Sequence, residues 1–140
     1  MPLKFHPEQG TILICDFKGF VPPEMVKRRP VVVVSPRFRT RDRLCTVVPL
    51  STTPPRPKCG YHLEITLDEP LPAPYNETSM WAKADMLCAI SHDRLQLPFI
   101  GKDAKGNRIY DERRLPDQVF QELLVCILTG LGLHRLTSHL

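Results

Sequence analysis

The chain of 140 residues lacks any apolar run long enough to span a bilayer. Residues 1–7 also lack the apolar segment that marks a secretory signal peptide. These two absences exclude the membrane-spanning and secreted classes, so we expect a soluble, cytoplasmic protein. No internal repeat or low-complexity tract is evident, and the length suits one core, so we expect a single domain over residues 1–140.

Disulfide frameworks and metal-ligand spacings are missing as well. The cysteines are odd in number and widely spaced, at Cys15, Cys45, Cys59, Cys88 and Cys126. We interpret them as reduced, mostly buried thiols. The histidines are scattered, and one close Cys and His pair, Cys59 and His62, is too little for zinc. We therefore expect no metal and no cofactor. His62 is interpreted as structural, although a position in a cleft would suit it as a proton carrier.

Proline and basic residues are what the chain does have. Prolines cluster at residues 22–23, 54–57 and 70–74, where they stiffen loops and prevent central-strand pairing. The net charge of +4 is unevenly distributed, because residues 27–58 hold nine Lys or Arg against one acid, Asp42. This basic region favours a polyanionic partner. A solvated basic loop is the plainer interpretation of the same charges.

Short apolar segments between the proline-rich loops predict strands. We expect strands at residues 10–17, 31–34, 44–50, 62–67 and 80–90. Asp85 is a candidate break in the last of these. Ser91 is typical of a cap for one helical turn over residues 91–95. The Lys-Gly-Asn turn between residues 97–102 and 107–111 predicts a small extra hairpin.

The clearest helix is expected near the C-terminus. Pro116 stands near its start, Asp117 lies in its first turn, and Gly130 and Gly132 close it. Its apolar residues recur at helical spacing, at Val119, Phe120, Leu123, Leu124, Ile127, Leu128 and Leu131. The order of elements predicts a mainly β protein, a small barrel with the amphipathic helix laid against it and the extra hairpin as an appendage.

The second and third strands predict a specific side-chain pair. If residues 37–43 form the loop of a hairpin in which Pro36 lies opposite Leu44, the register places Arg29 opposite Ser51. Directly opposed residues have Cβ atoms about 4.5–5.5 Å apart, so this pair could share one phosphate-sized ligand. A slip of one residue would send one of the two side chains to the other face of the sheet.

An arginine beside a hydroxyl suits the cleavage of a phosphodiester by its own 2′-hydroxyl. That reaction needs a group that fixes the phosphate and offsets the charge that develops on its oxygens. The Arg29 guanidinium stays charged and can grip phosphate with two donors, and Ser51 can donate a third hydrogen bond. Glu24 or Asp16 could act as the base or orient Arg29, although Asp16 is more typical of a cap at a strand end. The plainer interpretations are a surface arginine, a turn serine and a solvated loop carboxylate.

Several residues around this pair are candidates for binding RNA. Phe20, in the loop before the basic segment, could stack on a base, whereas Trp81 suits core packing at least as well. The polar candidates flank the two strand ends: Lys27, Arg28, Thr52, Thr53, Arg56 and Lys58.

Most of the first 95 residues resemble the MazF/PemK toxins of bacterial type II toxin-antitoxin systems. The similar segments are residues 10–17, Glu24, residues 28–36, 47–52, 62–65, 81–85 and 93–95, in the family's order. The final helix has a counterpart too. The resemblance implies an SH3-like barrel of the kind shared with the gyrase poison CcdB, usually a homodimer.

The resemblance also implies an activity and a partner. Such toxins are sequence-selective, metal-independent endoribonucleases that cleave single-stranded mRNA to 2′,3′-cyclic phosphate and 5′-hydroxyl ends, and a cognate antitoxin neutralises them. Arg29 falls on the family's catalytic arginine and Ser51 on its catalytic threonine. Because the pKa of a guanidinium exceeds about 12, we expect Arg29 to stabilise charge rather than accept a proton. The acceptor stays open between Glu24, a water and the substrate.

Two departures from the family pattern keep an alternative function open. Many relatives have Asp/Glu-Gln-x-Arg/Lys in the fifth strand, where this chain has residues 84–87, Ala-Asp-Met-Leu. The connection over residues 96–114 is also longer than usual. The alternative is a non-catalytic binding protein on the same fold, either a gyrase inhibitor or a nucleic-acid-binding module.

Overall fold

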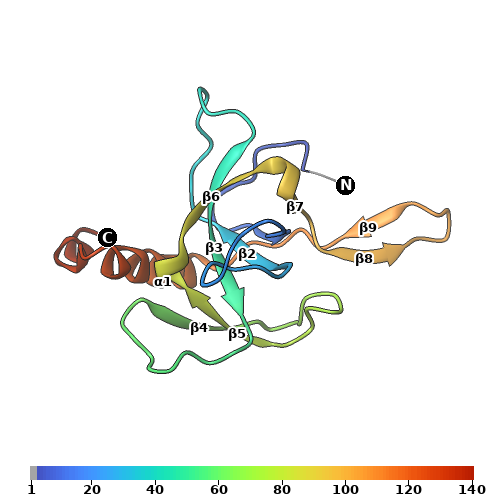
Figure 1. Cartoon of the computed structure of the whole chain (residues 1–140). Helices are drawn as coiled ribbons and strands as arrows, with labels where there is room; N and C mark the ends of the chain where they lie inside the picture. The colour runs from blue at the N-terminus through green and yellow to red at the C-terminus, as the bar shows by residue number, and fades with distance from the viewer. Residues whose placement is uncertain (1–2) are drawn as a thin grey trace.

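The computed structural model describes residues 3–140, and these form a curled antiparallel sheet with one long helix (Figure 1). The strands are β1 (Ile12–Cys15), β2 (Arg29–Val33), β3 (Leu44–Ser51), β4 (His62–Thr66), β5 (Ser79–Lys83), β6 (Cys88–Ser91), β7 (Leu95–Gln96), β8 (Phe99–Lys102) and β9 (Arg108–Tyr110). The helices are α1 (Asp117–Gly130) and the 3-10 turns η1 (Ala84–Met86), η2 (His92–Arg94) and η3 (His134–His139). No helix within residues 3–140 is long and apolar enough to cross a membrane.

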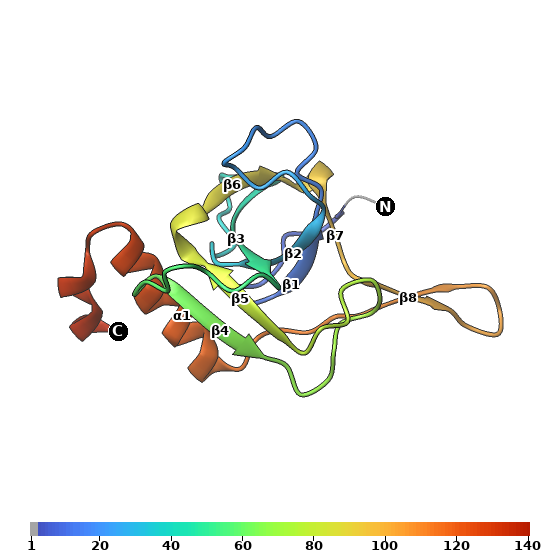
Figure 2. The same cartoon turned by 60° about the horizontal axis from the view of Figure 1, so that its bottom comes forward.

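The main sheet has the strand order β4-β5-β3-β2-β1-β7, and β6 pairs with β3 as well. The long strand β3 serves two partners on one side, because Leu44 to Val47 pair with β6 whereas Leu50 and Ser51 pair with β5. The turn η1 separates β5 from β6 and lets the chain follow this bend. The sheet therefore curls around on itself (Figure 2), as the predicted small barrel requires.

The register of β2 and β3 is the one predicted from the sequence. Val31 lies opposite Pro49, Val32 opposite Val48 and Val33 opposite Val47. Continuing this register by two residues brings Arg29 opposite Ser51. The two strand ends therefore meet at one edge, as expected.

Both faces of the central strands are buried, which explains the uninterrupted valines. Val32 and Val48 join the core beneath α1, whereas Val31, Val33 and Val47 join a second core on the opposite face. Side chains alternate between the faces of a strand, so a strand covered on both sides needs apolar residues throughout.

The predicted helix α1 packs against β4 and η1. Leu123 is fully buried there, together with Cys126 and Ile127. Its two glycines have different tasks. Gly132 adopts a φ of +76° just after the helix, which favours glycine. Gly130 lies inside the last turn, where an added Cβ would be only 3.2 Å from Cβ of Tyr61, so it permits close packing.

Smaller predicted elements are present as well. The strand expected over residues 80–90 is broken at η1, which contains Asp85. Ser91 caps η2, since its Oγ accepts the N–H of Asp93 at 3.2 Å. The expected extra hairpin is the pair β8 and β9. The sequence did not predict β7, which pairs with β1, nor η3.

All five cysteines are free, as predicted, and three of them are buried. Burial raises the pKa of the Cys15 thiol to about 12 and that of Cys45 to about 11. These two thiols are therefore protonated and inert at neutral pH.

Candidate active site

An open pocket of about 220 Å³ lies where β2 begins and β3 ends. We call it the Arg29 pocket. Its lining consists of Lys27, Arg28, Arg29, Pro30, Leu50, Ser51, Thr52, Thr53, Pro74, Tyr75 and Met80. It thus brings together Arg29, Ser51 and four of the residues expected to bind RNA.

Arg29 is half-buried and unpaired. Its Nε is buried and has no hydrogen-bond partner, and no ion pair within residues 3–140 involves its guanidinium. Burial lowers the pKa of Arg29 below its ordinary value, but an arginine stays charged at neutral pH. A half-buried cation without a counter-charge is costly, so this group favours an anionic ligand.

The neighbouring Arg28 is held differently. Its Nη2 lies 3.3 Å from a carboxylate oxygen of Asp16, and both side chains are partly exposed. The other oxygen of Asp16 accepts the backbone N–H of Lys18 at 3.0 Å. Asp16 therefore offsets the charge of Arg28 and leaves that of Arg29 uncompensated.

Ser51 is a buried polar residue, with 7% of its surface exposed. Its Oγ accepts the backbone N–H of Thr53 at 3.2 Å, which orients the hydroxyl at the strand end. A hydroxyl that accepts one hydrogen bond can still donate its own proton. Ser51 can therefore donate to a phosphate that Arg29 attracts into the pocket.

Tyr75 lines the same pocket, and the sequence analysis missed it. It belongs to the proline-rich loop between β4 and β5, where its N–H donates to the carbonyl of Pro72 at 3.0 Å. Burial raises the pKa of Tyr75, with a smaller opposing effect from Arg28. Its phenol is therefore a neutral hydrogen-bond donor at physiological pH. The feature of the sequence that could have indicated Tyr75 is its position as an aromatic residue directly after a stiff proline-rich segment.

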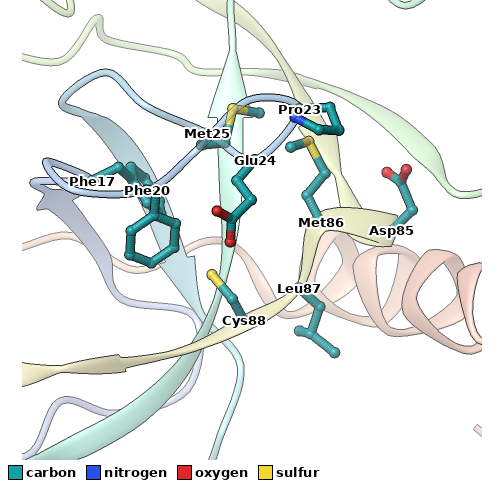
Figure 3. A pocket seen from close by; sticks show the side chains of 9 residues that line it. All are labelled: Phe17, Phe20, Pro23, Glu24, Met25, Asp85, Met86, Leu87 and Cys88. Atoms are coloured by element: carbon teal, nitrogen blue, oxygen red, sulfur yellow. The ribbon is translucent and has the colours of Figure 1, made fainter.

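The structure does not place Glu24 with Arg29 and Ser51. Glu24 lines a second hollow of about 420 Å³, the Glu24 hollow, formed by Phe17, Phe20, Pro23, Glu24, Met25, Asp85, Met86, Leu87 and Cys88 (Figure 3). Its carboxylate accepts the N–H of Val21 at 2.7 Å, because the loop turns back there and Glu24 N–H donates to the carbonyl of Val21. In Figure 3 the carboxylate faces the thiol of Cys88, whose pKa is raised by burial and then by Glu24.

Phe20 lies in the Glu24 hollow too, rather than in the Arg29 pocket. Its ring meets that of Phe17 edge-on at 5.2 Å, and the Arg94 guanidinium lies 5.0 Å from its centre. These contacts hold the ring against the core. The predicted role of Phe20 in stacking on a base beside Arg29 therefore has no support from its position.

Three further candidates lie outside the pocket lining. Arg56 and Lys58 are exposed in the loop after β3, and Lys58 Nζ lies 6.0 Å from the centre of the Trp81 ring. His62 is structural, as interpreted: Nδ1 accepts the N–H of Cys59 at 2.9 Å, and Nε2 lies 4.0 Å from Asp85. Among the lining residues of the Arg29 pocket there is no carboxylate and no imidazole.

Comparison with known proteins shows to which family the chain belongs. Residues 8–128 match the family model described as PemK-like, MazF-like toxin of type II toxin-antitoxin system. An uncharacterised protein of Escherichia coli K12, YifN, is 29% identical over 151 residues, covering 94% of this chain and 96% of its own. An uncharacterised Haemophilus influenzae protein is 35% identical over 109 residues, covering 68% of this chain and 73% of its own.

Solved structures share the fold. MazF from Deinococcus radiodurans superimposes with a TM-score of 0.62 at 19% identity, covering 92% of this chain and 99% of its own. A mycobacterial endoribonuclease in complex with its cognate antitoxin gives a TM-score of 0.60 at 19% identity, covering 91% and 97%. The predicted barrel fold is therefore confirmed.

Proposed function

Because the chain belongs to the PemK-like, MazF-like toxins of type II toxin-antitoxin systems, as the sequence predicted, we propose that it is an endoribonuclease acting on single-stranded RNA. The observation that carries the proposal is the presence of Arg29 and Ser51 in one open pocket. Similar folds in proteins named endoribonucleases support the same reaction.

The proposed reaction is an attack of the 2′-oxygen on the adjacent phosphorus. The new 2′-O–P bond closes a 2′,3′-cyclic phosphate while the P–O5′ bond breaks, and the leaving 5′-oxygen takes up a proton from water. Arg29 offsets the negative charge that grows on the non-bridging oxygens, where a half-buried cation acts more strongly than one in water. Ser51 and Tyr75 donate hydrogen bonds to the same phosphate and fix its orientation.

The proton of the 2′-hydroxyl goes to a water or to a non-bridging phosphate oxygen in this proposal. Glu24, one of the three candidate proton acceptors, lies in the other hollow and accepts the N–H of Val21, so we assign it no catalytic role. Charge stabilisation by Arg29 gives the scheme no need for a metal ion.

The test is cleavage of a long single-stranded RNA in the presence of EDTA, followed on a denaturing gel. Replacing Arg29 with Ala should reduce the rate by about 10²–10³, the usual cost of removing a charge-stabilising group. Arg135→Ala removes an equal charge from the exposed turn η3 and is the matched control. Full activity of Arg29→Ala, or equal losses in both variants, would reject this role for Arg29.

A neutralising antitoxin is the second part of the proposal. Solved relatives include a toxin bound to its cognate antitoxin and a MazE-MazF assembly. We propose that an acidic or apolar tail of such a partner covers the Arg29 pocket, and an acidic tail would also offset the uncompensated charge of Arg29. Expression of the chain alone should arrest bacterial growth, and co-expression with the product of a short neighbouring reading frame should relieve that arrest. The expected homodimer remains a prediction, to be checked by light scattering.

A further inference from the structure

The strands β8 and β9 form an arm that projects from the barrel. In Figures 1 and 2 this arm extends from one side of the molecule, at the opposite end from α1 and η3. The arm is a separate two-stranded sheet and does not extend the main one. Its residues are largely exposed, so it adds surface rather than core.

One face of the arm combines two cations with two aromatic rings. Phe99 lies opposite Tyr110, and Lys102 lies opposite Arg108. Arg108 and Tyr110 are two residues apart on one strand and therefore share a face. The contacts agree, since the Phe99 and Tyr110 rings are 5.8 Å apart and the Arg108 guanidinium lies 5.5 Å from the centre of the Phe99 ring.

The positive charges of the arm have no acidic partners. Within residues 3–140 no ion pair involves Lys102, Lys105 or Arg108. The one carboxylate of the arm, Asp103, accepts the N–H groups of Lys105 and Asn107 at 2.8 and 2.9 Å. Like charges directly opposed across two strands destabilise a hairpin unless an anion lies between them. The Lys102 and Arg108 pair thus favours an anionic ligand.

The base of the arm is tied to the wall of the Arg29 pocket. Arg113 follows β9 and pairs with Asp111 at 2.6 Å, and its guanidinium donates to the carbonyls of Glu69 and Pro70 at 2.5 and 3.3 Å. These carbonyls belong to the loop that also carries Tyr75, which lines the pocket. Figure 2 shows this loop beside the root of the arm.

We propose that the arm is a second binding site for single-stranded RNA, which contacts nucleotides beyond those held in the Arg29 pocket. Lys102 and Arg108 bind phosphates, and Phe99 and Tyr110 stack on bases. Exposed cations alone would suit any acidic surface, but aromatic rings on the same face suit unpaired bases. The inference rests on the proposed function, which supplies RNA as the ligand.

The test measures binding of 2′-O-methyl RNA, which cannot undergo 2′-attack, by fluorescence anisotropy at several salt concentrations. Two oligonucleotides are compared, of about 5 and about 20 nucleotides, the shorter one spanning less than both sites. In Lys102→Ala/Arg108→Ala the ratio of the affinities for the long and the short RNA should fall on the order of tenfold. The slope of the logarithm of the binding constant for the long RNA against the logarithm of the salt concentration should decrease in magnitude by about 1.4. Phe99→Leu keeps the arm apolar and should weaken the long RNA several-fold. Arg135→Ala is the control.

The outcomes separate the two proposals. Unchanged binding of the long RNA in the double variant would overturn the arm site, as would an equal loss in Arg135→Ala. If the variants weaken the long RNA while the wild-type chain cleaves no RNA, the arm site stands and the nuclease proposal fails. Circular dichroism of each variant shows whether the fold is retained.

Discussion

Removing one oxygen atom from the Arg29 pocket should separate catalysis from stability. Ser51→Ala deletes the hydroxyl that we propose donates to the scissile phosphate. The same oxygen accepts the N–H of Thr53 at 3.2 Å, so the change also removes one structural hydrogen bond. Thr53 is exposed, and water can replace the lost acceptor. We therefore expect unfolding to become easier by less than about 1 kcal/mol.

The catalytic loss should be larger than the loss of stability. A hydrogen bond to a charged group contributes about 1.5–3 kcal/mol, which corresponds to about a 10-fold to 160-fold fall in kcat/KM. Ser51→Thr keeps the hydroxyl, on the residue type that the family resemblance places there, and should retain most of the activity. Ser138→Ala removes a hydroxyl from the exposed turn η3, where it donates to the carbonyl of Arg135 at 3.5 Å, and is the control.

The assay is initial-rate cleavage of a fluorogenic single-stranded RNA, with the free energy of unfolding measured in urea. Wild-type kcat/KM in a folded Ser51→Ala protein would refute the role of the hydroxyl. If Ser51→Ala does not fold, Ser51→Cys retains the size of the side chain with a much weaker donor. Full activity of that variant would refute the role equally.

Three other changes have defined outcomes. Tyr75→Phe removes a neutral donor from the Arg29 pocket and should lower kcat/KM about 3-fold to 10-fold with the fold intact; an unchanged rate would remove Tyr75 from the site. Arg113→Ala should destabilise the protein by about 2 kcal/mol in urea, whereas Arg114→Ala, which breaks an exposed pair with Glu8, should cost less than about 1 kcal/mol; equal losses would contradict the tie at the base of the arm. Burial, followed by His6, lowers the pKa of His92 below its ordinary value of 6.5, so the unfolded chain binds the proton more readily. The neutral side chain's contribution to stability should be complete above pH 6.5 and decline as the pH falls towards the folded pKa. The free energy of unfolding should therefore vary less with pH in His92→Gln than in the wild type between about pH 7.5 and 5.5, and an equal pH dependence in the two proteins would contradict the assignment.

The central hairpin was predictable once residues 37–43 were taken as its loop, because the length of a hairpin loop sets the register of its strands. The valines alone do not set it, since β2 and β3 are buried on both faces and a slip by one residue would still bury apolar side chains. A shift by one residue would have moved Arg29 away from Ser51, and the observed pairs from Val31 to Val33 exclude that shift. The assumed loop was therefore sufficient to predict that a cation and a hydroxyl distant along the chain lie at neighbouring strand ends.

The surroundings of that pair were less predictable because they depend on distant contacts. Arg94 donates to the carbonyls of Asp16 and Lys18 and covers Phe20, so the path of the first loop is set by a residue after β6. That path carries Glu24 into its own hollow. Arg113 ties the loop that carries Tyr75 to the root of the arm. No periodicity in the sequence encodes either contact.

The chemistry of the cut ends tests the central claim most directly. Mass spectrometry of a single-stranded RNA incubated with the wild-type protein and EDTA should find 2′,3′-cyclic phosphates and 5′-hydroxyls, and a deoxynucleotide 5′ to the cut should block cleavage there. Those ends require attack by the 2′-oxygen on the adjacent phosphorus, which is the step that we propose for the Arg29 pocket. Products with 3′-hydroxyl and 5′-phosphate ends, or cleavage at the deoxy position, would contradict the account.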